Sequence, residues 1–276
     1  MRCIDFDKEF ERYITVWMKE HAKEYRNYDA MEAAMPQVYE QFLDTPVNWL
    51  SGAKPGEYFS QFDNAKQLVN WMEDYFKQRI PVPDMLMNRI GELGLAAEDA
   101  LMNLLGKERA TQEMKMAAVT LLREIDSAAP VSLYVNWQKN RSLEEDELAD
   151  NALESLDSLG ERAVPAMREA LQEANAAGQE ALLTLLANYP GDEKVLEIAL
   201  SLFETQKERA AVLADCLGRL GDERALPLLK KRAASEETPY LDYIELRSAI
   251  EALGGEAPER EFDAEDPAYD AMRSMQ

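Results

Sequence analysis

The stretch LGDERALPLL, Leu220–Leu229, decides the fold, because a near copy of it, LGERAVPAM, occurs at Leu159–Met167. Both copies begin with a leucine–glycine pair and continue with acidic residues, and each carries a proline, Pro227 or Pro165, one turn further on. Two copies of so unusual a segment in one chain indicate an internal repeat. The period of a repeat has to be found before single elements are assigned.

Leucine–glycine pairs and their weaker equivalents give that period. We call these six positions the markers, and they are Leu93-Gly94, Ile125-Asp126, Leu159-Gly160, Tyr189-Pro190-Gly191, Leu220-Gly221 and Leu253-Gly254. Successive markers are 30 to 34 residues apart. That spacing is typical of proteins in which each repeat is a pair of helices.

The residues three and seven positions before each marker are all apolar. They are Leu86 and Ile90, Ala118 and Leu122, Ala152 and Leu156, Leu182 and Leu186, Leu213 and Leu217, and Leu246 and Ile250. This spacing puts the side chains on one stripe of an α-helix, and a glycine beyond the last turn adopts the left-handed conformation that ends a helix. Each repeat is therefore predicted to end in an amphipathic helix whose stripe faces another helix.

That other helix is predicted to begin just after each marker. The acidic residues Glu161, Asp192 and Asp222 stand at these places, and an acidic residue satisfies free N–H groups at a helix start. Pro165 and Pro227 then fall one turn inside their helices, where proline removes a hydrogen bond and bends the helix. We expect kinks at equivalent places in two repeats.

These units resemble the short bacterial HEAT-like repeats, the type also found in bilin-lyase subunits and related scaffold proteins. The resemblance covers roughly residues 64–255 and is strongest in the last repeats. It implies an all-α fold, a right-handed α-solenoid of about six helical-hairpin repeats. Tetratricopeptide and ankyrin arrays have similar periods, but their signature residues are not in this sequence.

The region before the array is rich in aromatic residues. Of the 8 Phe, 11 Tyr and 4 Trp, fifteen lie before residue 81. Residues 1–63 are predicted to form a helical N-terminal cap, with helices at about 5–25 and 29–43, the second opened by a capping box of Asp29 and Glu32. An aromatic ligand pocket is the alternative, and its residues would be Trp49, Tyr58, Phe59 and Phe62.

Residues 256–276 form an acidic tail with scattered aromatic and methionine side chains. Its composition predicts partial disorder with a short helix after Pro267. The tail would dock on the last repeat or serve as a linear motif for another protein.

The formal charge of the chain is −23, from 30 Lys and Arg against 53 Asp and Glu. A surface this acidic repels phosphate backbones, so we exclude nucleic acid as a ligand and favour a basic protein or peptide. Acidity that only keeps the protein in solution is the alternative.

Composition also bears on the compartment. No apolar stretch approaches the roughly 20 residues that cross a bilayer, and the N-terminus lacks the apolar run of a secretion signal. Cys3 and Cys216, the only cysteines, are expected to be free thiols in a reducing compartment. We therefore expect a cytoplasmic protein that does not enter membranes.

The sequence offers no recognisable catalytic site. It has one histidine, His21, and therefore cannot form a multi-histidine zinc site or the His-Glu pairs of HEAT-like iron hydroxylases. Phosphate-binding glycine loops and the GxSxG elbow are absent. HEAT-like DNA glycosylases need a basic groove, whereas residues 96–276 carry 19 basic and 37 acidic side chains. We predict a non-enzymatic protein without cofactor or metal.

The second helix of each repeat lines the concave surface of a solenoid, which is the usual place for a partner. Positions two, five, nine and twelve before each marker point away from the buried stripe. The predicted partner-binding residues at these positions are Glu113, Met116, Glu147, Asp150, Glu154, Asp157, Glu180, Glu208, Asp215, Ile244 and Glu251. We expect this strip to bind a basic, extended protein segment, with charge to steer it and the apolar residues to hold it.

Other interpretations of these residues stay open. The strip could be an ordinary set of solvated helix positions. The protein could also be an accessory subunit of an enzyme, similar to a chromophore lyase, that uses Cys216 and the aromatic N-terminal region. A third possibility is self-association through the ends or the tail, and the sequence leaves the oligomeric state open.

Overall fold

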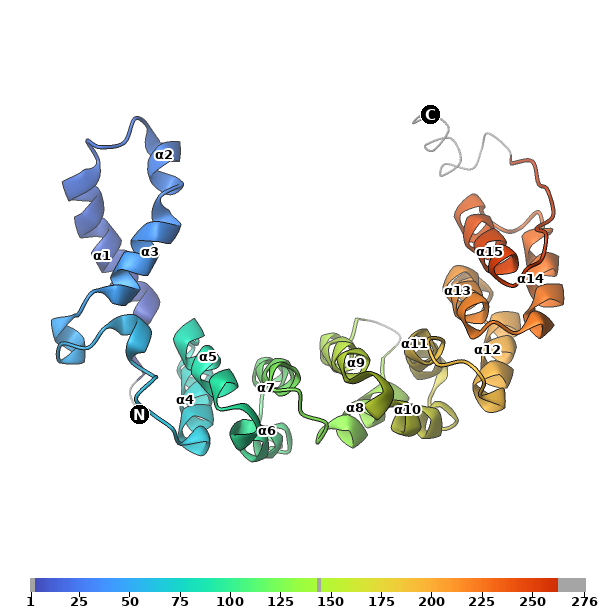
Figure 1. Cartoon of the computed structure of the whole chain (residues 1–276), viewed down its shortest axis with the longest axis horizontal. Coiled ribbons are helices and arrows are strands. Elements are labelled where there is room, and N and C mark those ends of the chain that lie inside the picture. The colour runs from blue at the N-terminus through green and yellow to red at the C-terminus, as the bar shows by residue number, and fades with distance from the viewer. Residues whose placement is uncertain (1–2, 143–144, 263–276) are drawn as a thin grey trace. The chain divides into compact units, whose positions relative to one another are not determined.

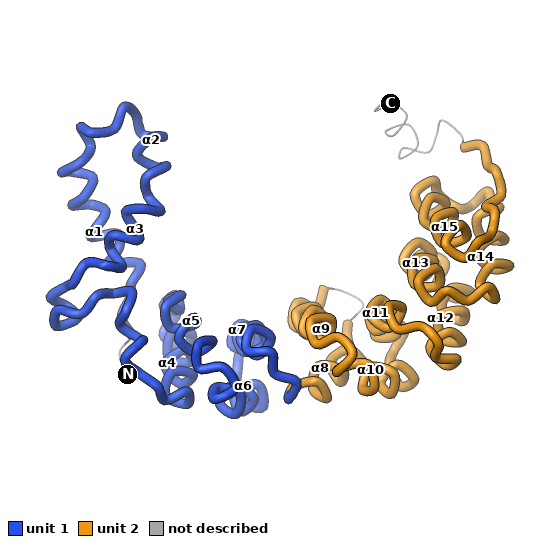
Figure 2. The backbone as a smooth tube through the Cα atoms, viewed as in Figure 1, with its two compact units in different colours: residues 1–129 blue, residues 130–276 orange. Residues whose placement is uncertain are grey.

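The computed structural model describes residues 3–142 and 145–262, and all of its regular elements within these ranges are helices (Figure 1). The predicted all-α class is therefore confirmed. The chain separates into two compact units, residues 1–129 and 130–276 (Figure 2). The expected boundaries after residues 63 and 255 stay predictions, and the helix expected after Pro267 lies outside the described residues.

Unit 1 begins with the aromatic-rich region and continues with two helix pairs. Its elements are α1 (Phe6–His21), α2 (Tyr28–Glu32), α3 (Met35–Asp44), the 3₁₀ turns η1 (Asn48–Leu50) and η2 (Pro55–Glu57), α4 (Ala65–Gln78), α5 (Asp84–Glu92), η3 (Gly94–Ala97), α6 (Glu98–Leu105) and α7 (Gln112–Glu124). The helix α4 packs against α5 and α6, and α7 packs against both α5 and α6.

The helix expected at 29–43 is in fact two helices, α2 and α3. Pro36 stands in the first turn of α3, and it ends the preceding helix because proline lacks an N–H and clashes with the previous turn. The cap of α2 is Asn27, whose side chain accepts a hydrogen bond from the Ala30 N–H at 2.9 Å. The predicted capping box of Asp29 and Glu32 was therefore wrong, and α1 also ends earlier than expected, at His21.

The aromatic residues of the predicted pocket pack against one another. The ring of Phe6 lies 5.8 Å from Trp49, 6.0 Å from Tyr58 and 5.9 Å from Phe59, between ring centroids. Phe59 has no exposed surface. Phe6 and Phe59 therefore belong to a hydrophobic core, which edge-to-face aromatic pairs stabilise, whereas 40% of Trp49 is exposed.

Within residues 130–142 and 145–262, unit 2 consists of four helix pairs. Its elements are α8 (Val131–Lys139), α9 (Glu147–Leu159), η4 (Gly160–Arg162), α10 (Val164–Leu171), α11 (Ala176–Leu186), α12 (Glu193–Thr205), η5 (Lys207–Arg209), α13 (Ala210–Leu220), η6 (Glu223–Ala225), α14 (Leu226–Ala233) and α15 (Tyr240–Ala252). The two members of each pair pack together, and α11 and α13 also contact the second helix of the neighbouring pairs.

The apolar stripe is confirmed at every position. All twelve residues that lie three and seven positions before the markers have no exposed surface. The markers themselves are the places where a helix gives way to the next segment. Five glycines there have positive φ, for example 73° at Gly221, and Asp126 replaces the sixth glycine with φ of 56°. Only glycine, and less readily Asp or Asn, adopts this conformation without strain.

The predicted proline kinks were wrong. Pro165 and Pro227 stand in the first turn of α10 and α14, and a 3₁₀ turn precedes each helix. Proline is favoured there, because the N–H groups of a first turn have no acceptor within the helix. Where no such proline follows, as after Asp192, the acidic residue caps the α-helix directly and accepts from the Lys194 and Val195 N–H groups.

Candidate interaction groove

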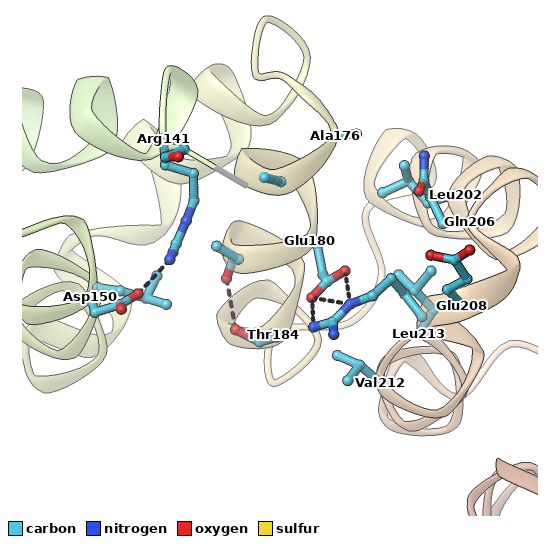
Figure 3. A pocket seen from close by; sticks show the side chains of 15 residues that line it. Arg141, Asp150, Ala176, Glu180, Thr184, Leu202, Gln206, Glu208, Val212 and Leu213 are labelled. Atoms are coloured by element: carbon cyan, nitrogen blue, oxygen red, sulfur yellow. Dashed lines mark hydrogen bonds and ion pairs between the residues drawn. The ribbon is translucent and has the colours of Figure 1, made fainter. Parts of the chain in front are cut away.

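A groove of about 590 Å³ runs beside α11, with α9 on one side and η5 and α13 on the other (Figure 3). We call it the α11 groove. Its apolar lining comes mainly from Leu153, Ala181, Leu202 and Val212. Charged and polar groups stand around these side chains, and two arginine–carboxylate pairs dominate them.

The first pair joins Arg141, which follows α8, to Asp150 on α9. The Arg141 Nη2 contacts the Asp150 Oδ1, and its Nη1 donates to the Gln138 Oε1 at 3.0 Å. Gln138 is fully buried, and its Nε2 donates to the carbonyl oxygen of Ala149 at 2.6 Å. Arg141 is therefore fixed by a buried amide as well as by a carboxylate, and only 13% of its side chain is exposed.

The second pair joins Glu180 on α11 to Arg209 at the start of α13. The Arg209 Nε donates to both carboxylate oxygens, at 2.8 and 3.1 Å, and Nη2 bonds to the Oε1 as well. Such two-point contacts fix the geometry of an arginine–carboxylate pair. The hydrogen bonds to Glu180 raise the pKa of Arg209, so this side chain is always charged.

A third arginine, Arg219, ties α13 to α11 close to the groove. It binds Asp215 through Nε and Nη2, at 3.0 and 2.7 Å. Its Nη1 donates to the Thr184 carbonyl oxygen at 2.8 Å and to the Asn188 Oδ1 at 2.9 Å. On α15, Arg247 pairs with Glu251 at 2.7 Å.

These ion pairs alter the charge that the predicted strip presents. Four of its carboxylates, those of Asp150, Glu180, Asp215 and Glu251, each pair with an arginine. The strip is therefore of mixed charge along α9, α11, α13 and α15, and not a continuous acidic surface. Two arginines, Arg219 and Arg247, could have been found from the sequence, because each stands four residues from its carboxylate.

The structure brings some of the predicted residues together and leaves others apart. Asp150, Glu180 and Glu208 line the α11 groove. The α9 residues Glu147, Glu154 and Asp157 are exposed outside it, and Ile244 lines a separate hollow on α15. Glu113 and Met116 lie on α7 in unit 1, so the α11 groove is built without them.

The two cysteines are free, as expected from the sequence, and both are buried. Cys216 on α13 has no exposed surface, and burial raises its pKa to about 11 against the nearby positive charge of Arg219. Burial and the charge of Asp74 raise the pKa of Cys3. A neutral thiol is a poor nucleophile, so the surroundings of Cys216 do not favour the role that the accessory-enzyme alternative gives it.

Both thiols are expected to resist iodoacetamide in the folded protein and to react only after denaturation, as intact-mass measurement would show. Rapid labelling of the folded chain at neutral pH would contradict the burial of both residues.

The raised pKa of Cys216 also predicts that stability depends on pH. The fold favours the neutral thiol of Cys216, so this contribution to stability is complete below pH 9 and is lost as pH rises through about 11. Cys216→Ala should flatten that part of the pH–stability curve.

Three further observations concern other kinds of site. Within residues 3–142 and 145–262, no three His, Cys, Asp or Glu side chains gather where they could hold a metal ion. No helix in the same ranges is both long and apolar enough for a membrane span. His21 pairs with Glu24 at 3.1 Å, and its ring lies 5.0 Å from that of Trp17.

The fold and the groove define the chain as an all-helical protein of paired helices with a partly apolar, arginine-bordered groove in its second unit. No family model, curated protein or solved structure matches the chain.

Proposed function

We propose that this chain is a non-enzymatic binding protein, a right-handed α-solenoid of HEAT-like repeats that takes up an extended segment of a partner protein. The recurrence of the buried stripe supports this architecture, because the same two positions are fully buried before all six markers. Solenoids of this kind present one helix of each pair as a continuous binding surface. The observation that carries the proposal is the α11 groove.

The chemistry of the groove suits a segment with both apolar and basic side chains. Leu153 and Val212 offer apolar contacts on opposite sides. Glu208 is exposed at the rim and has no ion pair within the described parts of the chain. Asp150 keeps 56% of its side chain exposed although it binds Arg141. Basic partner side chains would meet these carboxylates, and the net charge of −23 would steer them there.

The partner is expected to be a protein, with neither nucleic acid nor a membrane as ligand. An acidic chain repels phosphate groups on both. Free, buried cysteines fit a reducing compartment, so we expect the protein to act in the cytoplasm.

A charge reversal in the groove tests the proposal. The probe is a fluorescent ten-residue peptide that alternates lysine with alanine and leucine, and binding is followed by anisotropy. We expect binding that weakens as salt is added, and a loss of roughly five- to tenfold in affinity for Glu208→Lys, because an attractive contact becomes a repulsive one.

The matched control is Glu197→Lys on α12, an exposed carboxylate outside the groove. It changes the net charge by the same amount, so its effect should stay under about twofold if the site is local. Equal losses in both variants would assign binding to overall charge and contradict the groove. Affinity that does not respond to salt would contradict the electrostatic part of the proposal.

A further inference from the structure

The segment that follows α15 folds back on the last helix pair. Beyond the end of α15 and the pair Gly254-Gly255, residues 256–262 lie against the α14–α15 connection and the first turns of α15 (Figure 1). We call residues 256–262 the strap. The Tyr243 hydroxyl donates to the Pro258 carbonyl oxygen at 2.9 Å, which anchors the middle of the strap.

From Pro258 to Phe262, alternate side chains of the strap face the protein. Pro258, Arg260 and Phe262 are half-buried, whereas Glu259 and Glu261 are exposed. A two-residue alternation is typical of an extended segment that lies on a surface, because successive side chains point in opposite directions. From Pro258 on, three side chains therefore face the protein, while Glu259 and Glu261, like Glu256 at the start of the strap, stay in water.

Phe262 occupies an aromatic cradle on α15. Its ring centroid lies 4.9 Å from that of Tyr240 and 5.0 Å from that of Tyr243, with interplanar angles of 82° and 62°. The Arg260 guanidinium covers the same ring at 4.6 Å from the centroid. Edge-to-face ring pairs and a cation over a ring are both attractive, so this position favours an aromatic side chain.

Arg260 donates hydrogen bonds to two backbone carbonyl groups at once. Its Nη1 donates to the Thr238 oxygen and its Nη2 to the Glu236 oxygen, both at 2.7 Å. A planar guanidinium suits two acceptors fixed in this way, whereas the single ammonium of lysine does not span them. The position is therefore specific for arginine.

The receiving surface is held by contacts that do not involve the strap. The Thr238 hydroxyl donates to the Arg232 carbonyl oxygen at 2.7 Å. The Thr238 N–H donates to the Ser235 carbonyl oxygen at 3.1 Å. A surface that is already ordered loses little entropy when a peptide binds, so it can receive another segment when the strap leaves.

We propose that the surface formed by Glu236, Thr238, Tyr240 and Tyr243 is a peptide-binding site for extended segments of the pattern Pro-x-Arg-x-aromatic in a partner protein, and that the strap occupies it as a built-in competitor. The strap itself shows what the site accepts. Because it is tethered, its effective concentration is of millimolar order, and a partner has to displace it. The site is separate from the α11 groove and does not depend on the function proposed there.

A fluorescent peptide with the strap sequence EAPEREF tests this proposal on the full-length chain. The double variant Arg260→Ala/Phe262→Ala removes the competitor and leaves the receiving surface intact. We expect the peptide to bind this variant at least about tenfold more tightly than the wild type. The control variant Glu259→Ala/Glu261→Ala keeps the three contact residues, so it should bind the peptide as weakly as the wild type. Circular dichroism checks that both variants are folded.

A variant of the peptide serves as a second control. Replacing its arginine with lysine should weaken binding to the double variant by roughly tenfold, because one charged hydrogen bond is lost. The proposal is overturned if the peptide binds all folded variants equally, if it binds none of them, or if the lysine peptide binds as well. A concentration-dependent dimer of the wild type that the double variant does not form would assign the site to a second copy of the chain, and would also overturn it.

Discussion

Leu217→Ala is expected to lower the free energy of unfolding by about 3 to 5 kcal/mol, because it opens a cavity in a packed interior. Leu217 has no exposed surface and lies on α13, which packs against α12 and α15. Its equivalents in the neighbouring repeats, Leu186 and Ile250, are equally buried. Shortening this side chain therefore removes contacts both within one helix pair and with the next.

The matched control is Leu241→Ala. Leu241 is on α15 in the same unit, but 56% of it is exposed, so the loss should stay within about 0.5 kcal/mol. Urea-induced unfolding followed by circular dichroism measures both changes. A loss for Leu217→Ala no larger than that of the control would contradict the interior position on which the repeat analysis depends.

The buried stripe could be predicted from spacing alone because it repeats. Each repeat has to bury the same two positions against its neighbour, so a chance apolar residue at one marker is outweighed by the agreement of all six. Asp126 shows how far this holds. Its marker has aspartate in place of glycine, yet Asp126 adopts a positive φ like the glycines of the other markers.

Helix starts were harder to predict, because several local signals compete within a few residues. The acidic residues after the markers predict that α-helices begin there. At Glu161 and Asp222 the chain forms a 3₁₀ turn instead, and the α-helix begins beside Pro165 or Pro227. The proline signal for a first turn outweighs the acidic one, since it fixes φ directly.

The sequence located the carboxylates of the candidate site but not all of the arginines that pair with them. Helical spacing locates carboxylates on one face, but Arg141 and Arg209 stand outside the regular helix positions. Arg209 is 29 residues away from Glu180 in sequence. No local pattern predicts contacts that depend on how neighbouring pairs pack. The same holds for Arg260, whose acceptors are backbone carbonyl groups and leave no trace in side-chain composition.

Gly178→Ala is expected to destabilise the chain by about 2 to 3 kcal/mol, although glycine-to-alanine changes inside helices usually stabilise. Gly178 is buried in α11, where this helix passes close to the end of α8. An added Cβ would lie 2.2 Å from the Gln138 carbonyl oxygen. That neighbour is backbone, so no change of rotamer relieves the clash and the two helices have to move apart.

The movement would also reach the α11 groove, because the side chain of Gln138 holds Arg141 there. Gly178→Ala should therefore weaken binding of the lysine-containing peptide even at temperatures where the chain stays folded. Gly106→Ala, at the end of α6, is the control, since its Cβ would meet nothing closer than 3.7 Å and its φ is −79°. It should leave stability within about 0.5 kcal/mol of the wild type or raise it slightly. If both variants melted alike, the close approach of α11 to α8 would be contradicted, and with it the fixed position of Arg141 in the groove.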